Sequence, residues 1–180
     1  LPVLAGYFDT TASLIQLSLT FSMVGLAVGQ LVIGPLSDKY GRKKTLMASL
    51  VLFCISTIGC LYASDIYVFI FFRLLQGLSG AGGVVISKSI ATDLYEGREL
   101  TRFFSMLSSV QGIAPVCAPV LGGVLLEVTD WKGIFWILVL IGILLIMALA
   151  FFKESLNNEQ QHCGVFATFR NYIPVFQNAQ

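Results

Sequence analysis

One arginine lies deep within an otherwise apolar stretch of this chain. Arg73 sits inside the run VFIFFRLLQG, residues 68–77. A charge at the centre of a bilayer costs about 2.5–3.5 kcal/mol on insertion scales, so a charge at such a depth needs a physical reason. Gln76 follows three residues later on the same helical face, and Gly77 permits close approach of a neighbouring helix or a ligand. We interpret Arg73 as a cation that faces an internal aqueous cavity; a structural ion pair or a snorkelling side chain is the alternative.

A second candidate is the densest charge cluster of the chain, GPLSDKYGRKK, which lies between two apolar runs. In this cluster, Asp38 is expected to end the first helix, and Gly41 to permit the reversal into the second. Arg42 can pair with an acid or with helix-end carbonyls, and a carboxylate can dock at the N-terminus of a neighbouring helix. We interpret the cluster as a tight loop that docks on a partner surface, with a plain positive anchor as the alternative. The proposed loop residues are Gly34, Asp38, Gly41, Arg42 and Lys43.

A third candidate is the run GIAPVCAPVLGG, residues 112–123, within another apolar stretch. Small residues recur there every four positions and predict a close-packing ridge. Two prolines each remove a backbone donor and bend the helix. Such a helix suits a moving interface, although a static packing kink remains the alternative. The residues concerned are Ala114, Pro115, Ala118, Pro119, Gly122 and Gly123.

The composition indicates a membrane protein. Of 180 residues, 56% are hydrophobic and 12% are charged, whereas a soluble domain carries about 25% charged residues. The net charge of +1 gives no indication of nucleic-acid binding. The sequence has no Cys/His cluster, so we expect neither a metal nor a cofactor. It also has no paired acids or Ser/His couple within the apolar runs, which argues against a membrane enzyme.

Five apolar runs are long enough to cross a bilayer. A short apolar stub, residues 1–5, is interpreted as the end of a truncated first span. We therefore predict one all-α transmembrane unit over residues 1–154 and a linker over residues 155–180, and we interpret the chain as a fragment of a longer protein. The predicted spans are residues 13–36, 45–62, 66–90, 103–126 and 134–152.

Basic residues alternate with the predicted spans. On one side lie four bases in residues 39–44, then Lys88, Arg98 and Arg102, and later those of the tail, whereas the other side has only Lys132. The positive-inside rule predicts that the basic loops and the chain's end are cytoplasmic. Trp131 and Trp136 are then expected at the outer membrane interface, where aromatic belts occur.

Together these blocks resemble a known family. The run 34–44 resembles the loop motif of the major facilitator superfamily, RLLQG (73–77) resembles its fourth-span motif, and residues 114–123 resemble the fifth-span motif of its drug:proton antiporters. Residues 93–97 (DLYEG) and 130–136 (DWKGIFW) are similar to the Bcr/CflA, or bicyclomycin-resistance, subfamily.

The resemblance implies the N-terminal six-helix half of a carrier with two halves, its first span truncated. Asp38 and Arg42 would latch the cytoplasmic face, Arg73, Gln76 and Gly77 would couple to protons or substrate, and the proline motif would seal the central interface. No acid or histidine lies inside the predicted spans, so the proton-carrying group is expected in the missing first span, in the missing half or near Asp9.

The implied function is proton-coupled multidrug efflux across the bacterial inner membrane. Its partners would be lipophilic or amphiphilic drug-like molecules, protons, the lipid bilayer and the missing C-terminal half. A metabolite or sugar exporter of the same family is the alternative, and a non-transporting truncated membrane protein is a more distant one.

Overall fold

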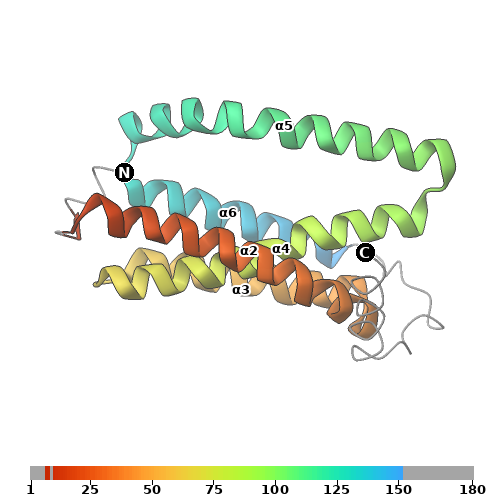
Figure 1. Ribbon diagram of the computed structural model, residues 1–180, viewed down its shortest axis with the longest axis horizontal. Coiled ribbons are helices and arrows are strands. Elements are labelled where there is room, and N and C mark those ends of the chain that lie inside the picture. Colours follow the sequence, from red (N-terminus) through yellow and green to blue (C-terminus); the bar gives the residue numbers. More distant parts are fainter. Residues whose placement is uncertain (1–6, 9, 152–180) are drawn as a thin grey trace, which may run out of the picture.

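The computed structural model describes residues 7–8 and 10–151, and their regular secondary structure consists of long helices (Figure 1). Five of these helices are long and apolar enough to cross a membrane. The predicted all-α membrane fold is therefore confirmed for this part of the chain. The expected remnant of a first span and the expected linker lie outside the described residues. The helices are α2 (Ala12–Tyr40), α3 (Arg42–Tyr62), α4 (Ile66–Leu94), α5 (Gly97–Val128) and α6 (Trp131–Ala150).

Several helices extend beyond the apolar runs that predicted them. Helix α2 continues past Asp38 to Tyr40, so the expectation that Asp38 ends this helix is wrong. Helix α5 begins at Gly97, well before the predicted start at residue 103. The physical reason is that an apolar run marks the hydrocarbon layer, which is about 30 Å thick. Backbone hydrogen bonding can continue into polar residues outside that layer.

Gly41 is the one residue between α2 and α3. Its backbone has φ 96° and ψ 150°, a conformation that L side chains rarely adopt. The Gly41 N–H donates to the Ser37 carbonyl at 3.0 Å, and its own carbonyl accepts from the Thr45 N–H at 3.2 Å. The predicted reversal at this glycine is thus present, and it is sharper than a loop.

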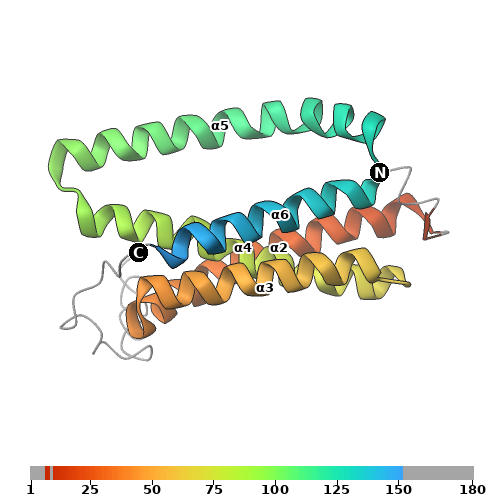
Figure 2. The same ribbon diagram turned by 180° about the vertical axis from the view of Figure 1, so that it is seen from behind.

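Helix α4 is the centre of the bundle. It packs along α2 on one side and along α3 on another, and α3 also packs against α6. Helix α5 is different: both views show it set apart from the other helices and joined to them at its ends (Figures 1 and 2). None of its side chains that the structure describes is buried. One long apolar helix therefore presents its surface without a partner in the described chain.

Glycines bring α2 and α4 into close contact. A methyl group added at Gly25 would overlap the Leu74 carbonyl oxygen, and one at Gly77 would overlap the Ser22 carbonyl oxygen. The Gly25 and Gly29 pair, spaced as G-x-x-x-G, thus faces the backbone of α4. Small residues at a membrane helix interface allow this backbone approach.

The close approach at Gly77 predicts a large difference between two glycines of the same helix. We expect Gly77→Ala to destabilise the bundle by about 1–3 kcal/mol, because the methyl group forces the helices apart. Gly80→Ala is the matched control, since a methyl group there has no neighbour within 4 Å. Thermal unfolding of the two purified variants in detergent measures the difference. Equal melting temperatures would contradict the interface.

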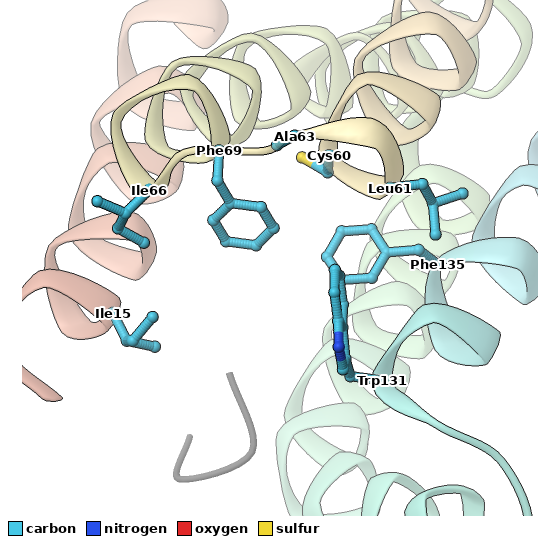
Figure 3. Close-up of a cluster of buried hydrophobic side chains, with 8 residues drawn as sticks. All are labelled: Ile15, Cys60, Leu61, Ala63, Ile66, Phe69, Trp131 and Phe135. Carbon is cyan, nitrogen blue, oxygen red and sulfur yellow. The ribbon is translucent and has the colours of Figure 1, made fainter. Parts of the chain in front are cut away.

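A cluster of buried hydrophobic side chains joins the start of α2, the end of α3 and the starts of α4 and α6 (Figure 3). Trp131 is 7% exposed there, whereas Trp136 is 52% exposed. Trp131 thus lies at the start of α6, at the end of the bundle where the outer interface is expected, but its side chain is covered by neighbouring segments. Its ring is enclosed by Tyr7 at 5.0 Å and Phe135 at 5.8 Å between ring centroids. The cluster consists of Ile15, Cys60, Leu61, Ala63, Ile66, Phe69, Trp131 and Phe135.

Candidate functional site

Arg42 joins the ends of α2, α3 and α4 at the basic end of the bundle. Its Nη1 donates to Asp38 Oδ1 at 2.5 Å and to Ser37 Oγ at 2.7 Å. Its Nε donates to Asp93 Oδ2 at 3.1 Å, near the C-terminus of α4. The arginine is 8% exposed. The Asp38 side chain is 43% exposed and that of Asp93 is 20% exposed. Since a planar guanidinium presents donors in a fixed fork, one side chain can hold both carboxylates.

Lys43 extends this connection to α6. Its Nζ donates to the Ala150 carbonyl at 3.0 Å, where a cation is stabilised by the negative end of the helix dipole. Gly34 meets this cluster through its backbone, because its carbonyl accepts from Ser37 Oγ at 2.8 Å. The nearest atom to a methyl group there would be Val85 Cγ1 at 3.9 Å, which is ordinary contact. Among the described residues, Gly34 is thus not a point of close helix packing.

Arg73 lies half-buried within the bundle. Its Nη1 donates to Gln76 Oε1 at 2.7 Å, so the two residues that the sequence placed on one helical face do meet. The amide of Gln76 in turn donates through Nε2 to Thr57 Oγ1 on α3 at 2.9 Å. The Arg73 Cζ atom lies 5.9 Å from the ring centroid of Phe135 on α6, within the range of a cation–π interaction.

The charge of Arg73 has no carboxylate partner among the described residues. A neutral amide and an aromatic face stabilise a guanidinium less than an ion pair does. The arrangement can therefore attract an anionic group from outside the described chain. Gly77 has a separate place, because it faces the backbone of α2 rather than the guanidinium.

The proline motif lies on the exposed helix α5. The helix runs through Pro115 and Pro119 without a break. A methyl group added at Gly122 or Gly123 would have no neighbour within 4 Å, and Ala114 and Ala118 are exposed too. These small residues pack closely against no helix of the described chain, so the close-packing ridge stays a prediction. The described residues also contain no group of three or more His, Cys, Asp or Glu side chains that could hold a metal.

Sequence reasoning left four contacting residues out of the site: Ser37, Asp93, Thr57 and Phe135. Asp93 had a usable signal, because the ends of α2 and α4 lie on the same side of the membrane when spans alternate. An acid at that end of α4 is thus available to Arg42. Thr57 and Phe135 gave no such signal, since their contact with the Arg73 network depends on how α3 and α6 are rotated against α4.

Comparison with protein families gives one match that covers most of the chain. Residues 1–162 match the family model described as Major Facilitator Superfamily. This match includes both the Arg42 and the Arg73 contacts.

Curated relatives agree with that match. The chain is 41% identical over 163 residues to an uncharacterized MFS-type transporter, YdgK, of Bacillus subtilis, with 89% of this chain and 40% of the relative covered. It is 32% identical over 149 residues to a bicyclomycin resistance protein homolog of Haemophilus influenzae, covering 83% and 37%. It is 33% identical over 150 residues to the multidrug resistance protein MdtL of Escherichia coli, covering 82% and 38%. The chain thus spans about 40% of the length of these relatives.

A solved structure shows the same fold. The crystal structure of the human organic anion transporter MFSD10 (TETRAN) superposes with a TM-score of 0.68 at 19% sequence identity, over 83% of this chain and 34% of that one. At this identity the likeness concerns the fold alone.

Proposed function

Because the chain belongs to the Major Facilitator Superfamily, we propose that it forms the N-terminal half of a drug:proton antiporter that works by alternating access. Membership places the chain with membrane transporters rather than with enzymes. The names of two relatives, a bicyclomycin resistance protein homolog and a multidrug resistance protein, favour drug efflux. The proposed substrates are lipophilic or amphiphilic drug-like molecules.

The observation that carries the proposal is the half-buried guanidinium of Arg73. It lies inside a membrane helix, is hydrogen-bonded to Gln76, and meets no carboxylate in the described chain. Charged residues in membrane segments are expensive and mark substrate, ion or proton pathways. We infer that Arg73 and Gln76 face the coupling group of the transport cycle. That group is either a carboxylate that carries the proton or an anionic part of the substrate.

The Arg42 contacts support a second part of the proposal, which is a latch on the cytoplasmic face. Asp38, Arg42 and Asp93 hold the ends of three helices, α2, α3 and α4, as one unit. The Asp38 side chain remains 43% exposed, so it is available to a partner helix N-terminus, whose dipole attracts a carboxylate. The proposed partner is the second half of the same carrier.

The same arrangement suggests an orientation. The basic ends of α2, α3, α4 and α5 lie together at one end of the bundle (Figure 1), and the positive-inside rule assigns such an end to the cytoplasm. We propose a multi-pass location in the bacterial inner membrane, with the end of the chain cytoplasmic. The unpartnered surface of α5, with its proline motif, is proposed to face the second half.

Export by the full-length protein tests the proposal. Proteoliposomes that hold the full-length transporter are prepared with an acidic lumen. Uptake of a fluorescent lipophilic cation is followed with and without this proton gradient. We expect gradient-dependent uptake, inhibition by unrelated lipophilic cations, and no uptake by proteoliposomes that hold residues 1–180 alone. Competition by small polar metabolites instead of lipophilic cations would support the metabolite exporter. Accumulation of the dye without a gradient would contradict proton coupling.

A further inference from the structure

A chain of hydrogen bonds connects α3 to the guanidinium of Arg73. The Thr57 hydroxyl donates to the Phe53 carbonyl at 2.6 Å and accepts from Gln76 Nε2 at 2.9 Å. Gln76 Oε1 accepts from Arg73 Nη1 at 2.7 Å. The donors and acceptors therefore match along this series of hydrogen bonds. Arg73 donates to the Gln76 amide oxygen, the Gln76 amide nitrogen donates to the Thr57 hydroxyl, and the hydroxyl donates to the Phe53 carbonyl.

The direction of this chain is set by chemistry. An arginine side chain has donors and no acceptor, so the amide oxygen of Gln76 must face it. The NH₂ group of Gln76 then points the other way and needs an acceptor. The Thr57 hydroxyl provides this acceptor, because its own hydrogen is already directed to the Phe53 carbonyl. If the amide turned over, its NH₂ donors would face the donors of the guanidinium, which is unfavourable.

Burial makes Thr57 hard to replace in this role. Thr57 is 0% exposed and Gln76 is 5% exposed, so no bulk water reaches the bond between them. Three other buried hydroxyls of α3 bond to backbone carbonyls instead. Thr45 donates to the Leu36 carbonyl of α2 at 3.5 Å. Ser49 donates to the Thr45 carbonyl and Ser56 to the Phe53 carbonyl, both within their own helix. Among the described residues, Thr57 is thus the hydroxyl of α3 that bonds to a side chain of another helix.

We propose that Thr57 is a positioning residue for Arg73, which it controls through Gln76. By accepting the amide N–H, it turns the Gln76 oxygen toward the guanidinium and restricts the rotation of the arginine. The face of Phe135, 5.9 Å from Arg73 Cζ, limits the side chain on the α6 side. This inference rests on the proposed function, in which the position of the Arg73 charge decides coupling.

The test compares variants in the full-length transporter at equal membrane abundance. Thr57→Val keeps the β-branched shape and removes the acceptor, and we expect its maximal export rate to fall about tenfold, as for the loss of one buried hydrogen-bond partner. Thr57→Ser keeps the hydroxyl and should stay within about twofold of the wild type. Ser56→Ala is the matched control, since it removes a buried hydroxyl that bonds only to its own helix, and it should export normally.

The positioning role would be overturned by normal export from Thr57→Val, or by a Thr57→Ser variant as impaired as Thr57→Val. An equal loss in Ser56→Ala would also overturn it, because the effect would then follow from packing. If Thr57→Val does not reach the membrane, Thr57→Ser and Thr57→Ala differ only by the hydroxyl and decide the matter in the same way. Arg73→Ala is measured alongside. If it is inactive while Thr57→Val is normal, only the positioning role fails; if it exports normally, the coupling role of Arg73 fails as well.

Discussion

Arg73→Ala is expected to abolish drug export by the full-length transporter while leaving its membrane insertion intact. The guanidinium donates to Gln76 at 2.7 Å and is proposed to meet an anionic coupling group during transport. A hydrogen bond to a charged group contributes about 1.5–3 kcal/mol, which corresponds to about ten- to a hundredfold in rate. Loss of the charge itself removes the coupling, so the total effect should exceed this range. Insertion should not suffer, because removing a charge from a membrane helix lowers the cost of inserting it.

Resistance of cells and dye export by vesicles both measure this effect. Arg73→Lys is an informative companion variant, since it keeps the charge but loses the planar fork, and we expect partial export from it. Lys88→Ala is the control. Lys88 is an exposed cation further along the same helix, α4, and its loss should leave export within about twofold, as for most surface substitutions. Unchanged resistance in cells that carry Arg73→Ala would refute the coupling role.

Arg42→Ala is expected to destabilise the basic end of the bundle more than any other substitution in the charge cluster. The arginine is 8% exposed, and its removal leaves the Asp93 carboxylate, whose side chain is 20% exposed, without the donor 3.1 Å away. Breaking a fully buried ion pair costs about 3–5 kcal/mol, and this partly covered pair should cost less. The partly exposed Asp38 adds little to this cost, because exposed ion pairs contribute about 0–1 kcal/mol. We therefore expect a clear fall in melting temperature for the purified full-length protein.

The two carboxylates of this cluster should then have different roles. Asp93→Asn is expected to lower the melting temperature more than Asp38→Asn, because Asp93 is the less exposed of the two. Asp38→Asn should instead shift the conformational populations, as seen in the cytoplasmic accessibility of a probe cysteine. Lys44→Ala is the matched control, since Lys44 is exposed and lies in the same run of bases. A melting temperature of Arg42→Ala equal to that of Lys44→Ala would contradict the role of the Arg42 contacts.

Much of the fold could be predicted from the sequence, because the hydrophobic effect acts on local runs of residues. Every helix of the described chain coincides with a predicted apolar run, and the turn at Gly41 follows from a backbone conformation that favours glycine. The prediction that Asp38 ends its helix was wrong, and α5 begins at Gly97, before the apolar run that marks its predicted span. Hydrophobicity reports the thickness of the bilayer core, and it carries little information about where hydrogen bonding stops.

In the candidate site too, contacts within one helix could be predicted from the sequence, whereas contacts between helices could not. The hydrogen bond between Arg73 and Gln76 follows from a spacing of three residues on one helix, and it was expected. The burial of Trp131 was not expected, because an aromatic residue near a helix start is read as an interface anchor unless its neighbours are known. Those neighbours are Tyr7, which precedes α2, and Phe135, which lies one turn along α6.

By itself the sequence determined that this chain is a set of membrane helices, which residues are charged inside them, and where glycines allow a turn or a close approach. These properties depend on residue type and on spacing along one helix. Only the tertiary structure decided that Arg42 binds Asp93, that Gly77 faces α2, and that Thr57 supports Gln76. Each of these contacts joins two helices, so it depends on how far each helix is rotated and shifted along its neighbour. That register is set by the packing of all their side chains together, which no single run of residues specifies.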